Sequence, residues 1–380
     1  MTNYPSLGAK NVEWVVKISK FCNLRCSYCY EFPFLADRAR MALPQLRRMF
    51  EHIAEYYANR RKRMDFVWHG GEPLLIKPSY YEAILKLQCD AFGPSRIPFT
   101  NSVQTNLTTL TPEVLAFLKS GIVSNVGVSL DLFGDQRVNS AGRSSQPVVL
   151  RNMQRLIDEG ISFGCITVLS QATKPHVASI YQFFEELETS FRLLPIYRTG
   201  YAGQQDRSAV SDEEIVEAFK QVVDLWLTSD STIQVRPIRD YVANVVGHIS
   251  NGRRSYYDKM ADEVVYIVEP DGSLFSVADP PDATLCHGNI FVSSLFELKR
   301  SSGYLRAVAA ARARMADTCN QCQYHGICSG YFMGEATPEQ RVVGSDGRLR
   351  CGVAKPIQEY IEQRLKASGF PLQSNVQPVM

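Results

Sequence analysis

The sequence predicts an α/β fold in which a partial (β/α)6 barrel is followed by a small α+β domain. The first observation is that apolar, strand-like runs alternate with amphipathic helical stretches along the first 230 residues. The second is proline at the expected first position of three helices, Pro44, Pro78 and Pro112, where the missing N–H does no harm. The third is a change of pattern near residue 259, where a hairpin-like segment and clustered cysteines replace the alternation.

Each strand and helix is predicted from its apolar pattern. Strands are expected at residues 12–19, 64–69, 97–105, 125–130, 162–169 and 190–197. Helices are expected at 44–58, 78–92, 112–120, 147–158, 177–188 and 212–227, with a helical linker at 237–249. We therefore expect a barrel domain at 1–230, a linker at 231–258, a second domain with a C-terminal helix at 259–368, and a tail at 369–380.

Three cysteines follow the first predicted strand. Cys22, Cys26 and Cys29 have the spacing Cys-x3-Cys-x2-Cys, and Tyr28 directly precedes the third. A [4Fe-4S] cluster normally takes four thiolates, so three in one loop leave one iron open to another ligand. Zinc is the alternative, but zinc sites usually contain two Cys-x2-Cys pairs. The spacing favours an iron–sulfur cluster at the carboxyl end of a strand, where parallel α/β folds place their active sites.

A second motif, Gly70-Gly71-Glu72-Pro73, follows the second predicted strand. Two glycines let a backbone approach a ligand closely, and the Glu72 carboxylate can accept hydrogen bonds from an ammonium group. Alone, this segment would be an ordinary turn. Together the two motifs resemble those of radical S-adenosylmethionine (SAM) enzymes, in which SAM chelates the open iron of the cluster.

The resemblance extends along the later strands and implies further contacts with SAM. Gln104 and Asn106 match a ribose-contacting position, although the glycine that follows in the family is Leu107 here. Ser129 matches the family's strand-four segment, and Arg137 opens a stretch in which arginine can pair with the SAM carboxylate. The implied SAM-binding residues are Tyr28, Gly70, Gly71, Glu72, Pro73, Gln104, Asn106, Ser129 and Arg137. Each polar residue alone would be a cap or turn residue, so it is the ordered series that carries weight.

The second domain contains another cysteine group. Residues 263–277 predict a β-hairpin around Pro270-Asp271-Gly272. Cys319, Cys322 and Cys328 follow with the spacing Cys-x2-Cys-x5-Cys, and Cys351 precedes the last predicted helix. These four thiolates are enough for one complete [4Fe-4S] cluster. The alternative is a zinc ribbon, with His287 and His325 nearby.

The hairpin and the cysteine spacing resemble the SPASM or twitch subgroup of radical SAM enzymes. A full SPASM domain holds two auxiliary clusters with seven cysteines. Here Val277, Ser293 and Phe332 stand where the family has ligands, so the resemblance implies one auxiliary [4Fe-4S] cluster. Cys286 is interpreted as a packed or spare residue, and Cys89 and Cys165 are predicted to lie in the core.

The family implies the chemistry. Electron transfer to SAM gives a 5′-deoxyadenosyl radical, which abstracts hydrogen from the substrate. The candidate substrate-facing groups are Asp131, Tyr197 and Arg198, whereas Trp68 is better explained as a core residue and His69 as a structural histidine. No general base can be assigned from the sequence.

The partial SPASM pattern resembles peptide maturases that form cyclophane-type C–C crosslinks in ribosomally made precursor peptides. Only about eleven residues precede the first strand, so a leader peptide is expected to bind the enzyme's own surface or a separate partner. The alternative is a dehydrogenase or epimerase acting on an aminoglycoside or sugar. Sulfatase maturation is disfavoured because those enzymes resemble the seven-cysteine pattern. A cysteine-cluster sensor without catalysis is the non-enzymatic alternative.

Composition limits the partners. The net charge is +2, and no apolar run approaches the roughly 18 residues of a membrane span, so neither nucleic acid nor membrane is expected. Seven of the ten cysteines fall in groups at iron–sulfur spacing, which indicates reduced thiols and a cytoplasmic protein. The family implies an external electron donor such as flavodoxin or ferredoxin.

Overall fold

The computed structural model describes residues 11–197, 207–276, 282–336 and 341–369. The barrel strands are β1 (Asn11–Ser19), β2 (Arg63–Gly70), β3 (Phe99–Thr105), β4 (Asn125–Ser129), β5 (Phe163–Leu169), β6 (Phe191–Pro195) and β7 (Val235–Arg236). The six predicted strands are all present, each within two residues of its expected ends. The additional strand β7 lies within the segment interpreted as a linker and is too short to give a period-two pattern.

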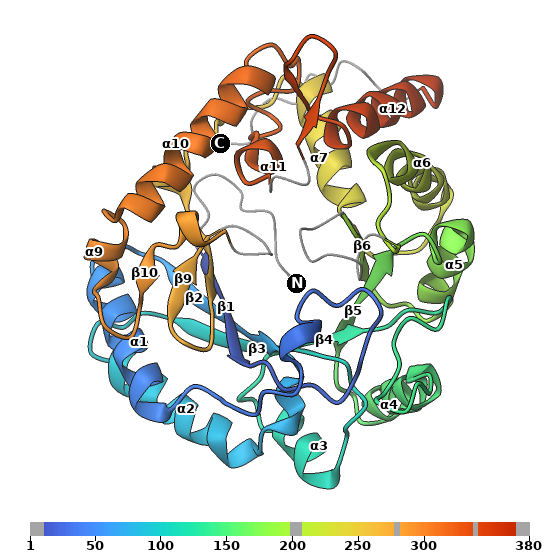
Figure 1. The fold of residues 1–380 in the computed structure, drawn as a ribbon. Coiled ribbons are helices and arrows are strands. Elements are labelled where there is room, and N and C mark those ends of the chain that lie inside the picture. The colour runs from blue at the N-terminus through green and yellow to red at the C-terminus, as the bar shows by residue number, and fades with distance from the viewer. Residues whose placement is uncertain (1–10, 198–206, 277–281, 337–340, 370–380) are drawn as a thin grey trace, which may run out of the picture.

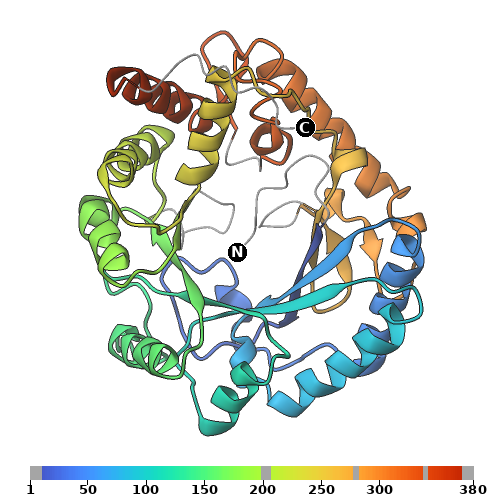
Figure 2. The ribbon, with the colours of Figure 1, turned by 180° about the vertical axis from the view of Figure 1, so that it is seen from behind.

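Helices α1 to α6 lie outside these strands, as Figures 1 and 2 show. They are α1 (Leu43–Tyr57), α2 (Pro78–Phe92), α3 (Pro112–Lys119), α4 (Gln146–Asp158), α5 (Val177–Glu186) and α6 (Asp212–Thr228). Pro44, Pro78 and Pro112 do lie in the first helical positions. The predicted partial barrel with helices on its outer face is therefore confirmed.

The rest of the chain lies across the open side of this sheet (Figure 1). Its helices are α7 (Ile238–Ile249), α8 (Lys259–Asp262), α9 (Leu295–Leu298), α10 (Ser302–Thr318), α11 (Tyr331–Gly334) and α12 (Ala354–Ala367). Its strands are β8 (Val265–Val268), β9 (Ser273–Phe275), β10 (Gly288–Asn289), β11 (Val342–Val343) and β12 (Leu349–Arg350). Helix α12 packs against α6 and α7, which connects the end of the chain to the barrel.

The second part of the chain extends the barrel sheet, which the sequence did not predict. The strand order is β10-β9-β8-β1-β2-β3-β4-β5-β6-β7, and β8 pairs with β1 in parallel. The expected hairpin is present, since β8 and β9 pair antiparallel. Trp14 of β1 stacks on Tyr266 of β8 at 4.6 Å between ring centroids. The free edge of β1 is thus satisfied by a strand that comes much later in the chain.

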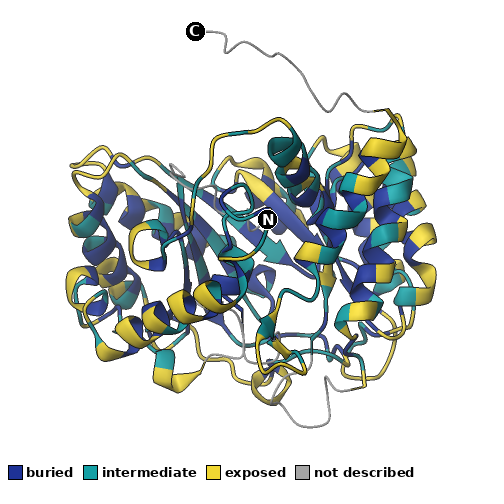
Figure 3. Cartoon of the chain, turned by 90° about the horizontal axis from the view of Figure 1, so that it is seen from above, coloured by how far each residue is buried: buried dark blue, intermediate teal, exposed yellow. Residues whose placement is uncertain are grey.

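Residues coloured as buried lie along the strands and on the helix faces turned toward the sheet, and exposed residues lie on the outer faces of the helices (Figure 3). Cys165 is fully buried, as predicted. The prediction for Cys89 is wrong, because Cys89 is exposed on α2. The buried face of this helix includes Gln88. Cys89 is the next residue, and its side chain therefore points about 100° away from that of Gln88. Among the described helices, none has the length and apolar character needed to cross a membrane.

Candidate functional site

The first cysteine loop is fastened at the carboxyl edge of the sheet. Cys22 and Cys26 are each 8% exposed and pack with Leu24 and Leu35, against which Tyr28 and Cys29 also pack. The Cys22 N–H donates to the Leu35 carbonyl at 3.1 Å. Further along the loop, Arg25 N–H and Ser27 N–H donate to the carbonyls of Val138 and Gln136 at 2.6 and 2.9 Å, respectively. The structure therefore brings the three predicted cluster ligands together in one buried loop.

The environment of the thiols suits a cluster ligand. Leu24 N–H and the Asn106 side-chain amide donate to Cys22 Sγ at 3.4 and 3.7 Å, and such bonds tune iron–sulfur sites. No three His, Cys, Asp or Glu side chains within the described ranges are close enough to hold a single metal ion. A tetrahedral zinc site needs sulfur atoms about 3.8 Å apart, given Zn–S bonds of about 2.3 Å. The donor set is the observation that bears on the choice, because three thiolates in the first loop suit a [4Fe-4S] cluster with one open iron.

Burial raises the pKa values of two thiols in the first cysteine loop. Burial raises the pKa of Cys22 to about 11 and that of Cys29 to about 12. Since only thiolates bind metal, loading the loop must release protons. In metal-free protein, we expect iodoacetamide alkylation of Cys22 and Cys29 to keep accelerating above about pH 9, where an ordinary thiol levels off. Peptide mapping by mass spectrometry measures this, with exposed Cys89 as the internal control. A plateau below pH 9 in the loop would contradict the burial argument.

The two glycines of the second motif are required by the cysteine loop itself. Gly70 has φ of 117°, and a Cβ there would lie 2.1 Å from the Ser19 carbonyl oxygen. A Cβ at Gly71 would lie 2.2 Å from the Phe21 carbonyl oxygen. The Gly71 N–H and the Glu72 N–H donate to these same two carbonyls, each at 2.9 Å. The glycines therefore let the loop after β2 support the cysteine loop, and their contact with SAM stays a prediction.

Glu72 connects this loop to the end of β3. It is 3% exposed, and its carboxylate accepts hydrogen bonds from Leu74 N–H, Thr105 Oγ1 and Asn106 N–H at 2.8, 2.7 and 2.6 Å. Thr105, which carried no sequence signal, is thus part of the site. These contacts give Glu72 a positioning role, and the expected bond to an ammonium group remains untested.

The Glu72→Gln variant tests this role. The side-chain amide nitrogen of glutamine cannot accept from an N–H, so a buried donor loses its acceptor at a cost of about 1–3 kcal/mol. Urea unfolding of metal-free protein measures the loss, with exposed Glu82→Gln on the same face of the chain as control. Equal unfolding midpoints for the two variants would remove the positioning role.

Tyr28, Asp131 and Arg137 form a hydrogen-bonded group beside the cysteines. The Tyr28 hydroxyl donates to Asp131 Oδ2 and accepts from Arg137, both at 2.5 Å. Asp131 Oδ1 accepts from Val168 N–H at 2.9 Å, and Arg137 lies 3.8 Å from Asp131. The buried Nε–H of Arg137 has no hydrogen-bond acceptor among the described residues. A buried guanidinium with an unused donor fits a carboxylate ligand, which agrees with the predicted role of Arg137.

The remaining predicted contacts are divided between two places. Asn106 lies at the cysteine loop, where its amide also donates to Asn23 at 3.0 Å. Gln104 donates to Ser129 at 2.9 Å, and it lines a cavity of about 340 Å³ that includes Glu13 near the start of β1. Leu107 has φ of 52°, a left-handed conformation that favours the glycine expected from the family. Asn106 is thus adjacent to the cluster ligands, whereas the contact of Gln104 and Ser129 with SAM stays a prediction.

The candidate substrate-facing residues lie in different environments. Asp131 is 5% exposed and is engaged with Tyr28 and Arg137. Tyr197 is half-buried beyond the end of β6, and Arg198, like Val277, lies outside the described residues. Trp68 is 1% exposed and donates to Asn101 at 3.0 Å, which agrees with its core interpretation. The Gly70 N–H donates to His69 Nδ1 at 2.7 Å, which fits a structural histidine.

A square of buried charges that the sequence analysis missed supports the cysteine loop. Lys17 Nζ lies 2.9 Å from Glu31 and 2.7 Å from Glu269. Lys20 Nζ lies 3.1 Å from each of the same two carboxylates. Glu31 follows Cys29 by two residues, and Glu269 directly follows strand β8. These residues are spread over the sequence, so spacing alone gave no signal for the square.

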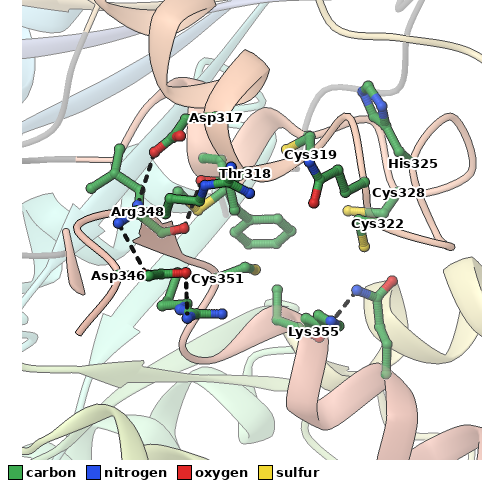
Figure 4. Close-up of a pocket in the computed structure, with 18 residues that line it drawn as sticks. Asp317, Thr318, Cys319, Cys322, His325, Cys328, Asp346, Arg348, Cys351 and Lys355 are labelled. Carbon is green, nitrogen blue, oxygen red and sulfur yellow. Dashed lines mark hydrogen bonds and ion pairs between the residues drawn. The ribbon is translucent and has the colours of Figure 1, made fainter. Parts of the chain in front are cut away.

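The four cysteines of the second domain line one cavity of about 310 Å³. Figure 4 shows Cys351 approaching from the segment before α12, apart from the group of Cys319, Cys322 and Cys328. Burial raises the pKa of Cys319 to about 12, with the other thiols adding to the effect, and burial raises that of Cys351 to about 12. The structure therefore brings all four predicted ligands to one site. His325 lines the same cavity, as the zinc alternative expected, whereas His287 is bound to Ser276 at 2.9 Å elsewhere.

Residues 16–184 match the family model described as the radical SAM superfamily. The chain contains a radical SAM domain. Such a domain uses a [4Fe-4S] cluster to cleave SAM reductively, so the predicted SAM and [4Fe-4S] cofactors are confirmed.

The sequence similarity to two curated proteins extends beyond the radical SAM domain into the second part of the chain. The serine-type anaerobic sulfatase-maturating enzyme of Klebsiella aerogenes is 26% identical over 362 residues, covering 90% of this chain and 85% of that protein. The cysteine-type enzyme of Clostridium perfringens (strain 13 / Type A) is 23% identical over 335 residues, covering 82% and 86%.

Two solved structures have a similar fold. The structure of native anSMEcpe with bound AdoMet and Cp18Cys peptide has a TM-score of 0.74 at 19% identity, covering 96% of this chain and all of that chain (100%). Streptococcus suis SuiB bound to precursor peptide SuiA has a TM-score of 0.55 at 14% identity, covering 87% and 74%. The fold is therefore similar to that of the anSMEcpe structure over nearly the whole chain.

Proposed function

We propose that this protein uses its radical SAM domain to oxidise a side chain of a peptide or protein substrate. The proposal is carried by one observation, the near full-length similarity to enzymes named for sulfatase maturation. A second neighbour in structure is described with a bound precursor peptide. Both kinds of neighbour act on polypeptides, which favours this substrate class over the aminoglycoside or sugar alternative.

The residues have distinct proposed roles. Cys22, Cys26 and Cys29 hold the cluster that binds SAM, and Arg137 binds the SAM carboxylate through the donor that no described residue uses. Glu72 and the two glycines before it keep the cysteine loop in place. Asp131 fixes the orientation of Tyr28 and Arg137. When bound, the cluster and SAM supply a 5′-deoxyadenosyl radical by one-electron reductive cleavage.

We further propose one auxiliary [4Fe-4S] cluster at Cys319, Cys322, Cys328 and Cys351, and flavodoxin or ferredoxin as electron donor. The cavity that the four thiols share supports the cluster, since a complete [4Fe-4S] cluster takes four thiolates. An auxiliary electron acceptor favours net oxidation of the substrate by two electrons. Two oxidations fit, an intramolecular C–C crosslink of the cyclophane type and the side-chain oxidation performed in sulfatase maturation. The relatives favour the second, and the reduced ligand set at Ser293 and Phe332 favours the first.

Reconstituted enzyme with SAM and reductant tests the proposal against two peptide sets. One set contains the short peptides encoded beside the gene, and the other contains sulfatase peptides with serine or cysteine at the maturation position. A crosslink is expected to remove about 2 Da and to suppress fragmentation between the joined residues in tandem mass spectrometry. A matured sulfatase peptide is expected to react with a carbonyl-specific hydrazide probe.

The control is the Cys26→Ala variant, which should modify neither set. Vigorous formation of 5′-deoxyadenosine without any peptide change would overturn the peptide assignment in favour of the small-molecule alternative. Absence of 5′-deoxyadenosine under strong reductant would instead support the sensor alternative.

A further inference from the structure

Three aromatic side chains from separate elements lie beside the cysteine site of the second domain. Tyr197 follows β6, Tyr241 belongs to α7 and Phe332 belongs to α11. All three line a small cavity of about 90 Å³ together with Cys351. Phe332 also lines the larger cavity formed with the other three cysteines of the second domain. This aromatic layer is therefore in direct reach of the proposed auxiliary cluster.

The other side of the aromatic layer reaches the SAM site. Ile196, directly before Tyr197, packs with Val168, and Tyr28 packs against this same cluster. The Val168 N–H donates to Asp131, which in turn accepts from Tyr28. The backbone is fixed here, because Ile196 N–H donates to the Leu169 carbonyl at 2.9 Å. Packing and hydrogen bonds thus connect Tyr28 to Ile196, the residue directly before Tyr197.

The rings of the aromatic layer are close to one another. The centroids of Tyr241 and Phe332 are 5.4 Å apart with an interplanar angle of 34°. Tyr241 is 3% exposed, so its ring is shielded from water. Phe332 occupies the position at which the SPASM pattern has a cysteine ligand. By that resemblance, a ring stands next to the four-cysteine cavity where the family pattern has an iron ligand.

We propose that Tyr197, Tyr241 and Phe332 form the route by which an electron passes from the SAM side of the barrel to the auxiliary cluster. Aromatic rings lower the barrier to electron tunnelling compared with saturated side chains. The inference rests on the proposed function for the presence of that cluster. It assigns the three rings as positioning residues for electron transfer.

The electron and proton balance is simple. The 5′-deoxyadenosyl radical takes a hydrogen atom from a substrate C–H bond and becomes 5′-deoxyadenosine. The substrate radical then gives one electron through the rings to a [4Fe-4S]2+ cluster, which becomes [4Fe-4S]+, and one proton passes to water as the new bond forms. An external one-electron acceptor of the flavodoxin or ferredoxin class restores the 2+ state.

Electron exchange between the two clusters tests the route without any substrate. A photochemical reductant places one electron on anaerobic, reconstituted enzyme, and rapid-freeze EPR follows its redistribution between the clusters. The Cys351→Ala variant assigns the signals. In Phe332→Leu, which keeps an apolar side chain without a ring, we expect the fast phase of redistribution to be lost. Phe332→Trp should restore it.

Tyr197→Leu is the second variant, since it removes a ring outside the cysteine cavity. Phe183→Leu is the matched control, because Phe183 is a half-buried phenylalanine on α5 that lines neither cavity. Iron content and thermal unfolding of each variant report on a purely structural role. In one outcome, both variants hold about eight iron per chain and still redistribute the electron between the clusters at the wild-type rate. That result would overturn the aromatic route and leave the auxiliary cluster in place. About four iron in the wild type would overturn the auxiliary cluster, and with it the route.

Discussion

The Cys351→Ala variant is expected to keep SAM cleavage and to lose the oxidised product. Cys351 lies in the segment before α12, and it shares its cavity with the three clustered cysteines. The radical SAM cysteine loop follows β1 and packs in a cluster of its own with Leu24 and Leu35. Removing Cys351 should therefore weaken the electron acceptor while leaving the source of the radical intact.

The measurement combines iron content, 5′-deoxyadenosine and modified peptide from the same anaerobic reaction. Iron should fall from about eight toward four per chain, and product should fall about tenfold or more relative to 5′-deoxyadenosine. Cys26→Ala is the reciprocal variant, in which 5′-deoxyadenosine itself should disappear. Cys89→Ala is the matched control, because Cys89 is exposed and belongs to neither site. Full product formation by Cys351→Ala with one remaining cluster would disprove electron acceptance at this site.

The second large effect is expected at the square of charges formed by Lys17, Lys20, Glu31 and Glu269. Glu269→Gln keeps the side-chain volume but removes a negative charge that contacts both lysines, at 2.7 and 3.1 Å. Lys17 is 1% exposed, so water cannot replace the lost partner. Breaking a buried pair by removing one member costs about 3 kcal/mol or more.

Urea unfolding of metal-free protein measures this cost. A cycle of Lys17→Met, Glu269→Gln and the double variant isolates the pair, and we expect a coupling energy of about 1–3 kcal/mol. Asp258→Asn is the control, because its ion pair with Arg312 is exposed and should contribute about 0–1 kcal/mol. Additive effects within the cycle would mean that the square does not act as a unit.

The barrel was predictable because its signals are local. Strand runs such as 125–130 and the prolines at helix starts need only neighbouring residues, and the structure has them within two positions. The pairing of β8 with β1 was not predictable, because a strand's pattern does not identify a distant partner. The apolar pattern correctly predicted the helix that contains Cys89. It did not predict the face on which Cys89 lies, because neighbouring residues of a helix point in directions about 100° apart.

In the candidate site too, local sequence patterns were predictable and contacts between distant residues were not. The cysteine spacings correctly identified two groups of residues that the fold brings together. The function of Gly70 and Gly71 was only partly visible, since the backbone they approach belongs to another loop. Thr105 and Glu269 gave no signal at all, because their importance depends on buried charges that meet only in three dimensions.

The pairing of β8 with β1 also has a consequence for synthesis on the ribosome. β1 emerges first, yet its outer edge has no partner until the segment around residue 265 has left the exit tunnel. Until then a nascent chain presents an apolar, hydrogen-bonding edge that other chains can pair with. Truncated chains that stop before β8 are expected to aggregate, whereas fusions at the carboxyl end of the full chain should express better.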